Sequence, residues 1–335
     1  MLTIVGRFFV CLLTAVVVAV CGLLGVIYVL EKGPSVRARD LFVVSMNETS
    51  AAKFVPTIFL TQEEVDEILA KNSFQDNNVV TDTDLVVISK EPVKNAEKDE
   101  SIDPDGDGID ILEISGSTFK GKLMLVYDPS RVFLGISGSF GPGLLGKTLP
   151  DLYNSYDNVV AAVNGGLWDD RAGHGSGSEP VGVVISEGKG LCGDPWSWDI
   201  AGMTYDNKLV VGTYTVQQAL DAGIRDAVYF GPALVVNGEP LEALGTGSGL
   251  NPRTAIGQRA DGTIMLMTID GRQGNSLGAS LTDVRDMMVK YGAMNAYNLD
   301  GGSSTNMIYN GEIINNGASL VGLRRMPTAW LVRGE

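Results

Sequence analysis

Apolar residues follow three different patterns along the chain. Residues 8–30 form an uncharged run of 23 residues, residues 31–108 mix short apolar groups with many charges, and residues 109–335 hold many short apolar runs separated by turn-forming residues. A run of about 20 apolar residues is long enough to cross a bilayer as a helix. We therefore predict an N-terminal membrane anchor over 1–30, a stalk or linker over 31–108 and one large domain over 109–335.

The charges at the two ends of the anchor bear on its orientation. Arg7 precedes the run, whereas Lys32, Arg37 and Arg39 follow it, and this count favours a cytoplasmic C-terminal domain. A very short leading tail is nevertheless typical of a signal-anchor, and long domains are translocated largely regardless of charge. Since no small-x-small cleavage site precedes Glu31, we expect an uncleaved, single-pass anchor with the large domain outside the cytoplasm.

The stalk contains one helix signal and one imitation of a metal site. Thr61 and Glu64 have the spacing of a capping box, which predicts one short helix. Residues 91–110 are acidic and poor in aromatic side chains, which indicates a solvated linker. Within it, residues 103–108 imitate the start of a calcium loop, but Ile114 stands where the bidentate glutamate belongs. We therefore expect no metal ion there.

In the large domain, near-continuous apolar runs predict strands that are buried on both faces. The predicted strands are 111–115, 122–127, 132–136, 159–163, 181–185, 209–211, 227–236, 263–269 and 294–298. Helices are predicted over 215–222 and 280–291, because each begins at a capping box and is followed by a glycine. The 42 glycines favour many tight turns. The expected fold class is α+β: a sheet-rich single domain with few helices, preceded by a transmembrane helix and a stalk.

The net charge of the chain limits the classes of molecule that it can bind broadly. The formal net charge of −15 argues against broad binding to nucleic acid, since no basic field would attract phosphates from a distance. An anionic substrate would instead need local arginines. Cys192 is the only cysteine outside the anchor, so no intrachain disulfide is expected in the large domain.

Four polar clusters lie at the ends of predicted strands. Arginine has a planar fork that matches phosphate, and aspartate can act as nucleophile, base or acid. Adjacent glycines let the backbone approach a ligand closely. Each cluster alone is more typical of an ordinary turn or a surface ion pair, but four of them predict one shared site. The clusters are Asn164-Gly165-Gly166, Arg253 with its neighbours, Asp270-Gly271-Arg272 and Asp300-Gly301-Gly302-Ser303-Ser304.

The order of these motifs resembles that of the phosphodiester glycosidase family over about residues 110–333. The resemblance implies hydrolysis of the bond between the anomeric carbon of a sugar and a phosphodiester oxygen, which releases a free sugar and a phosphomonoester. The expected partner is a phosphorylated glycan or a sugar-1-phosphodiester of the cell envelope or exopolysaccharide, and no cofactor is expected. Two alternatives stay open: a non-catalytic module that binds polymer phosphates, and a glycosyl-phosphate transferase.

The resemblance also suggests roles for single residues. Arg253 is expected to bind the phosphate, with Arg272 assisting. Asp300 is expected to face the anomeric carbon, and Asp270 to act as its partner acid or base. The other residues expected around the substrate are Asn164, Gly165, Gly166, Gly271, Gly301, Gly302, Ser303 and Ser304.

Three residues lie at or beside departures from the family pattern. Ser303 stands where many relatives have a third glycine, which adds a hydroxyl beside the expected substrate. Asp283 stands where relatives often have glutamate, but its place three residues after Ser280 favours helix capping. His174, the only histidine, lies in a glycine-serine loop and is more typical of a solvated loop residue than of a catalyst.

Overall fold

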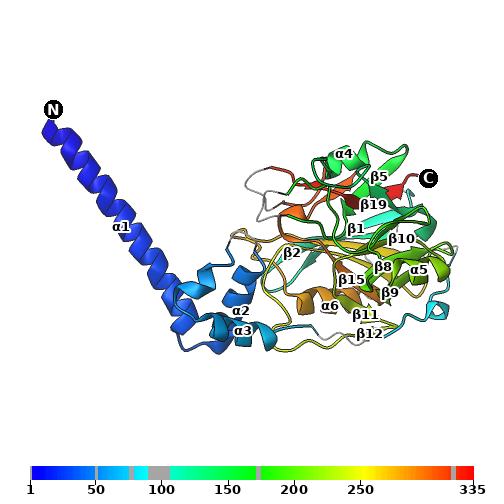
Figure 1. Ribbon diagram of the computed structural model, residues 1–335, viewed down its shortest axis with the longest axis horizontal. Coiled ribbons are helices and arrows are strands. Elements are labelled where there is room, and N and C mark those ends of the chain that lie inside the picture. The colour runs from blue at the N-terminus through cyan, green and yellow to red at the C-terminus, as the bar shows by residue number, and fades with distance from the viewer. Residues whose placement is uncertain (1, 50–51, 75–78, 90–105, 171–174, 318–321) are drawn as a thin grey trace.

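The computed structural model describes residues 2–49, 52–74, 79–89, 106–170, 175–317 and 322–335. Helix α1 (Leu2–Lys32) projects away from the rest of the chain (Figure 1). Among the described residues, its part Gly6–Lys32 is the one helix that is long and apolar enough to cross a membrane. A signal sequence near an N-terminus has the same length and composition. The apolar helix is therefore present, and its role as an anchor stays a prediction.

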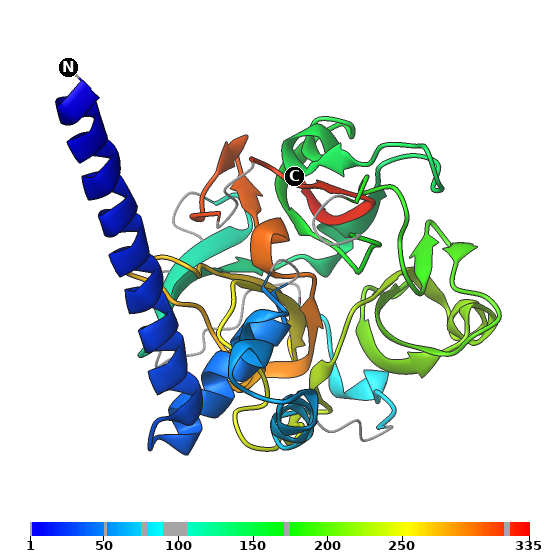
Figure 2. The ribbon, with the colours of Figure 1, turned by 60° about the vertical axis from the view of Figure 1, so that its left-hand side comes forward.

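Three short helical segments follow α1 and pack together: α2 (Val36–Asn47), η1 (Val55–Ile58) and α3 (Gln62–Ala70). The capping box predicted at Thr61 and Glu64 is present and begins α3. A small core of Val43, Val44, Leu60, Val65 and Ile68 joins the segments. The sequence does not predict α2, because its apolar residues 41–44 are consecutive rather than spaced by three or four. Figure 2 shows these segments between α1 and the sheets.

Parts of the predicted stalk lie directly against the large domain. The Thr81 hydroxyl donates to the Val211 carbonyl at 2.7 Å, and the Val87 N–H donates to the Ala260 carbonyl at 2.8 Å. Most of the predicted acidic linker, including the first residues of the calcium-like motif, falls on 90–105, outside the described residues. At the end of that motif, Asp107 accepts a hydrogen bond from the Tyr309 hydroxyl at 2.6 Å.

Three antiparallel sheets form the large domain. The seven-stranded sheet has the order β1 (Ile109–Ser115), β2 (Lys120–Val126), β14 (Ile264–Ile269), β13 (Arg253–Arg259), β15 (Ala293–Leu299), β11 (Ala233–Val236) and β12 (Glu239–Pro240). One five-stranded sheet has the order β7 (Lys189–Cys192), β6 (Val184–Ser186), β10 (Ile224–Tyr229), β8 (Trp198–Thr204) and β9 (Leu209–Tyr214). The other has the order β17 (Glu312–Ile313), β16 (Met307–Tyr309), β5 (Val159–Asn164), β19 (Thr328–Arg333) and β3 (Val132–Ile136). Strands β4 (Lys147–Thr148) and β18 (Arg325–Met326) form a separate pair.

Each of the three sheets has one face on a common core and the other face covered by one helix. The common core contains residues of all three sheets, among them Ile256, Val228 and Trp330. The outer faces pack against α6 (Leu281–Lys290), α5 (Val216–Asp221) and α4 (Leu149–Tyr153), respectively. This layering explains why so many strands are apolar at every position, as predicted for strands buried on both faces.

The predicted fold class is confirmed, and most predicted elements have a counterpart. The capping boxes predicted for α5 and α6 are present, and Asp283 caps α6. The run 227–236, predicted as one strand, is divided between β10 and β11, because the chain turns at Gly231 with φ +84° before Pro232. Among the strands that the sequence misses are β8, β16 and β19, which contain polar or small residues within the apolar runs.

Candidate active site

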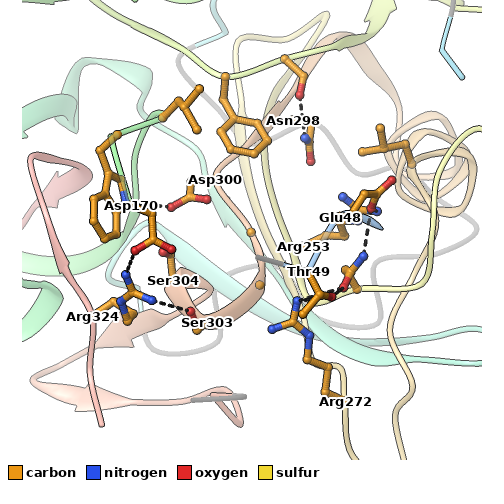
Figure 3. Close-up of a pocket in the computed structure, with 18 residues that line it drawn as sticks. Glu48, Thr49, Asp170, Arg253, Arg272, Asn298, Asp300, Ser303, Ser304 and Arg324 are labelled. Atoms are coloured by element: carbon orange, nitrogen blue, oxygen red, sulfur yellow. Dashed lines mark hydrogen bonds and ion pairs between the residues drawn. The ribbon is translucent and has the colours of Figure 1, made fainter. Parts of the chain in front are cut away.

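A pocket of about 450 Å³ lies where ends of strands from the different sheets meet. This volume is within the range of about 300–1,000 Å³ that is usual for small-molecule sites. Figure 3 shows its charged side chains in two groups, one around Asp300 and one around Arg253. The residues that line it are Glu48, Thr49, Leu167, Trp168, Asp170, Phe230, Gly231, Asn251, Arg253, Arg272, Leu281, Asn298, Asp300, Gly301, Gly302, Ser303, Ser304 and Arg324.

Strand pairing explains why distant motifs meet here. In an antiparallel sheet, the start of one strand lies beside the ends of its two neighbours. Arg253, the first residue of β13, pairs with Ile269 at the end of β14, and Thr254 pairs with Leu299 at the end of β15. The residues that follow β14 and β15 therefore emerge on either side of Arg253. Asp300 is the first residue after β15.

The Asn164-Gly165-Gly166 motif holds the backbone of Asp300. The Asn164 amide donates to the Asp300 carbonyl at 2.5 Å, and the Asp300 N–H donates to the Gly165 carbonyl at 3.1 Å. A Cβ on Gly165 would lie 2.4 Å from Thr328 Oγ1, and one on Gly166 would lie 2.7 Å from the Tyr229 carbonyl oxygen. The two glycines are thus required by close backbone packing. Asn164 is 1% exposed and these three residues do not line the pocket, so they support Asp300 from behind.

The Asp300 carboxylate is held in a partly apolar setting. Trp168 Nε1 donates to Asp300 Oδ2 at 3.1 Å. Burial raises the pKa of Asp300 to about 6; hydrogen bonds from Ser304, Trp168 and the Gly301 backbone act in the opposite direction, and the nearby charge of Asp170 raises the pKa further. A carboxyl group with a pKa near neutrality can exchange protons at physiological pH, which is typical of catalytic acids and bases.

Arg324 connects several residues on this side of the pocket. Its guanidinium forms an ion pair with Asp170, lies 4.9 Å from the centre of the Trp168 ring, and approaches the Ser303 hydroxyl at 3.5 Å. The Trp168 ring in turn donates to Asp300. The arrangement places a second carboxylate and a cation beside Asp300, as Figure 3 shows.

On the opposite side, Arg253 is almost fully buried and extensively bonded. Nε donates to the Ala279 carbonyl at 3.1 Å, and Nη2 donates to the Gly249 carbonyl at 2.7 Å and to the Ser248 hydroxyl at 3.0 Å. Nη2 also forms an ion pair with Glu48 Oε2 at 2.6 Å. This guanidinium is therefore fixed in position at the pocket wall.

Arg272 is the second arginine of this group. It donates to Asn251 Oδ1 at 3.0 Å and to Thr49 Oγ1 at 3.2 Å. Its φ of +58° is unusual for a residue with a side chain, and such strain is often found at functional sites. Gly302, with φ +61°, lies so close that a Cβ there would be 3.4 Å from an Arg272 guanidinium nitrogen.

Besides the Asn164-Gly165-Gly166 motif, two more residues of the predicted site, Asp270 and Gly271, are not in the pocket lining. Both Asp270 oxygens accept hydrogen bonds from Asn316, at 3.0 Å from its N–H and 3.2 Å from its amide. Gly271 packs on Pro252, where a Cβ would lie 2.7 Å from the proline nitrogen. The structure therefore gives Asp270 a loop-fixing contact and places Asp170, which the sequence analysis did not single out, beside Asp300.

Asn298 presents an acceptor that has no hydrogen-bond partner among the described residues. Its Nδ2 donates to the Gly231 carbonyl at 2.8 Å, which fixes the orientation of the amide and leaves Oδ1 unsatisfied. The residue is 1% exposed, and an unsatisfied buried acceptor costs about 1–3 kcal/mol. Asn298 lies in β15, two residues before Asp300, and both residues line the pocket.

The raised pKa of Asp300 predicts a pH-dependent stability difference for Asp300→Asn. Because the folded-state pKa of about 6 exceeds the ordinary value of 3.8, the folded state binds this proton more tightly than the unfolded state does. The stability contributed by the protonated group is fully present below pH 4 and is lost as pH rises through 6. Asparagine cannot ionise, so the variant should be more stable than wild type at pH 7.5 by up to about 3 kcal/mol.

Urea unfolding of both proteins at pH 4 and pH 7.5 measures this effect. The advantage of the variant should shrink at pH 4, and an equal difference at both pH values would contradict the assigned pKa.

Some pocket residues that were not predicted lie beside a predicted motif, and others have no signal in the local sequence. Trp168 and Asp170 follow the Asn164-Gly165-Gly166 motif directly, so extending that strand-end cluster by four residues would have found them. Glu48 and Arg324 have no local signal, since each reaches the pocket only through tertiary packing.

The fold is similar to that of a known structure, and the sequence is similar to those of known proteins. A zebrafish structure titled "N-acetylglucosamine-1-phosphodiester alpha-N-acetylglucosaminidase catalytic domain auto-inhibited by pro-peptide" is 22% identical, covers 68% of this chain and 82% of that chain, and has a TM-score of 0.55. The similarity establishes a shared fold. Residues 157–333 match the phosphodiester glycosidase family, which is more than half of the chain. The chain belongs to the phosphodiester glycosidase family.

Curated relatives are similar over part of their length. The SPbeta prophage-derived uncharacterized protein YomE of Bacillus subtilis is 36% identical over 172 residues, which cover 47% of this chain and 25% of that protein. The human N-acetylglucosamine-1-phosphodiester alpha-N-acetylglucosaminidase is 25% identical over 216 residues, which cover 58% of this chain and 40% of the enzyme. The chain thus spans less than half the length of these relatives.

Proposed function

We propose that this protein hydrolyses a sugar-1-phosphodiester bond in an envelope or extracellular glycan and releases a free sugar and a phosphomonoester. The observation that carries the proposal is that one pocket holds the Asp300 carboxylate together with Arg253, Arg272 and Arg324. Hydrolysis of a glycosyl phosphate needs a carboxylate near the anomeric carbon and cations near the departing phosphate. Family membership, and the activity named for the human relative, support the same reaction.

In the proposed mechanism, Asp300 faces the anomeric carbon and acts as nucleophile or as the base for water. Its pKa of about 6 leaves it mostly ionised at neutral pH. Asp170 replaces Asp270 as the second carboxylate, because Asp170 lines the pocket and Asp270 is bonded to Asn316 outside it. Arg253 and Arg272 stabilise the departing phosphate, which is already a good leaving group and needs little general-acid help.

The pocket also offers features suited to a sugar. Leu167 and Phe230 supply apolar surface, and Ser303 and Ser304 supply hydroxyl groups. The unsatisfied Asn298 Oδ1 could accept a hydrogen bond from a sugar hydroxyl or amide once a substrate is bound. Asn298 Oδ1 needs a hydrogen-bond donor, which a carbohydrate supplies and a simple alkyl phosphodiester does not.

The apolar helix α1 supports a proposal for where the substrate is found. A single-pass N-terminal anchor, with the large domain outside the cytoplasm, would keep the site near envelope glycans. The acidic net charge of −15 does not favour nucleic acid as a partner.

The proposal predicts turnover of sugar-1-phosphodiesters by the full chain in detergent micelles. A panel that varies the sugar should yield free reducing sugar and phosphomonoester in equal amounts, measured together by chromatography. Binding without turnover across the panel would favour a non-catalytic module instead. Transfer of the glycosyl group to an added acceptor alcohol, with no release of free sugar, would favour a transferase.

A further inference from the structure

The residue that follows α2, Glu48, places its carboxylate inside the candidate active site. Oε1 accepts a hydrogen bond from the Gly249 N–H at 3.0 Å. Oε2 accepts from Asn251 Nδ2 at 2.9 Å and from Arg253 Nη2 at 2.6 Å. Both carboxylate oxygens are therefore bound by donors of the large domain, although Glu48 itself belongs to the segment next to the apolar helix α1.

These donors form an anion-binding cradle. A backbone N–H, a side-chain amide and a guanidinium are the groups that proteins use to bind phosphate oxygens. Arg272 adds a second positive charge at the rim, since it donates to Asn251 Oδ1 at 3.0 Å. We define the cradle as Gly249, Asn251, Arg253 and Arg272. In this structure its occupant is the Glu48 carboxylate.

The end of α2 is fitted closely to the cradle. The Leu250 N–H donates to Ser45 Oγ at 2.8 Å, and a Cβ on Gly249 would lie 2.3 Å from Ser45 Cα. Glu48 is nevertheless the more accessible partner of its ion pair: its side chain is 27% exposed, against 9% for Arg253. The carboxylate therefore reaches the cradle from the solvent side, the side from which a substrate would enter.

Resting on the proposed function, we propose that the cradle is the phosphate subsite and that Glu48 occupies it as an internal competing anion. A carboxylate and a phosphate cannot share the same donors, and their like charges repel at contact distance. Substrate phosphate then binds Gly249, Asn251 and Arg253 only in molecules in which Glu48 has withdrawn. The measured affinity is lowered in proportion to the fraction of molecules with an empty cradle.

The alternative is that Glu48 is a fixed part of the wall that holds Arg253 in place. The two roles have opposite consequences. Removing an internal competitor strengthens phosphate binding, whereas removing a support for Arg253 weakens it.

The test measures binding of inorganic phosphate to the full chain in detergent micelles by isothermal titration calorimetry. Glu48→Gln keeps the shape of the side chain and removes its charge, and we expect phosphate to bind at least about tenfold more tightly than to wild type. The matched control is Glu64→Gln, which removes a carboxylate that pairs with Lys32 on the same N-terminal segment. The control should bind phosphate as wild type does.

A second variant tests the same idea without changing Glu48 or any residue of the cradle. Ser45→Val removes the hydrogen bond to Leu250 that holds the end of α2, so it should also strengthen phosphate binding. Equal or weaker phosphate binding by both Glu48→Gln and Ser45→Val, with melting curves that show folded protein, would overturn the proposal. Phosphate binding is measured without turnover. Absence of sugar phosphodiester hydrolysis would therefore refute the proposed function, and the binding data would still decide whether Glu48 competes with phosphate.

Discussion

Asp300→Asn is expected to lower kcat/KM for a sugar-1-phosphodiester by about 10³-fold. The amide keeps the size of the side chain and can still accept the hydrogen bond from Trp168, but it can neither attack the anomeric carbon nor remove a proton from water. The loss should appear mainly in kcat, because the group acts on the reacting carbon rather than on substrate binding. Initial rates of sugar release over a range of substrate concentrations give both constants.

Asp270→Asn is the matched control for this variant. It makes the same chemical change after the end of β14, on the other side of β13, where the carboxylate bonds to Asn316 outside the pocket. We expect it to change kcat/KM by less than about tenfold. Similar losses for both variants would mean that Asp270, as the sequence suggested, shares the chemistry, and full activity of Asp300→Asn would remove Asp300 from the mechanism.

The pH dependence of wild-type kcat/KM gives a further check on Asp300. If the ionised carboxylate is the active form, activity should fall as pH drops below about 6. In Trp168→Phe, loss of the hydrogen bond that favours the charged form should move this fall to higher pH.

The elements that sequence predicted correctly are those set by local rules. The box at Ser280 and Asp283 fixes the start of α6, and the run of β14, apolar except for Thr268, indicates burial on both faces. The run 227–236 was misjudged, because the same apolar composition fits one long strand or two short ones that belong to different sheets. Assignment of strands to sheets depends on pairing partners that a single sequence does not display.

The candidate site likewise contains residues that local motifs predict and residues that depend on tertiary packing. Asp300, Arg253 and Arg272 could be predicted, since each follows or begins a strand in a motif with a recognisable order. Which of the nearby carboxylates faces the pocket could not be predicted, because Asp170 and Asp270 both follow strands and differ only in the direction of the loop. Glu48 lies more than 200 residues from its partner Arg253, so only the docking of α2 on the large domain reveals it.

Arg253→Lys is expected to lower kcat/KM by about 10²-fold. Lysine keeps the positive charge but loses the planar fork, so it cannot donate to the Ala279 carbonyl and to the anion in the cradle, here Glu48, at the same time. The charge would no longer be held at the position of the departing phosphate. Some loss of stability is also expected, about 1–3 kcal/mol, because buried carbonyls such as that of Gly249 lose a donor.

Arg259→Lys separates the two effects, because Arg259 lies at the other end of the same strand. It is 4% exposed and donates through Nε to the Tyr291 carbonyl at 2.8 Å, so the substitution should destabilise the fold to a similar degree. It lies outside the pocket lining, and its kcat/KM should stay within about threefold of wild type at a temperature where the protein is folded. Measured side by side with melting curves, equal losses of kcat/KM in the two variants would show that Arg253 acts through stability alone. A loss confined to Arg253→Lys would instead place its guanidinium among the groups that bind the phosphate, because both substitutions replace a buried arginine of β13 and only Arg253 lines the pocket.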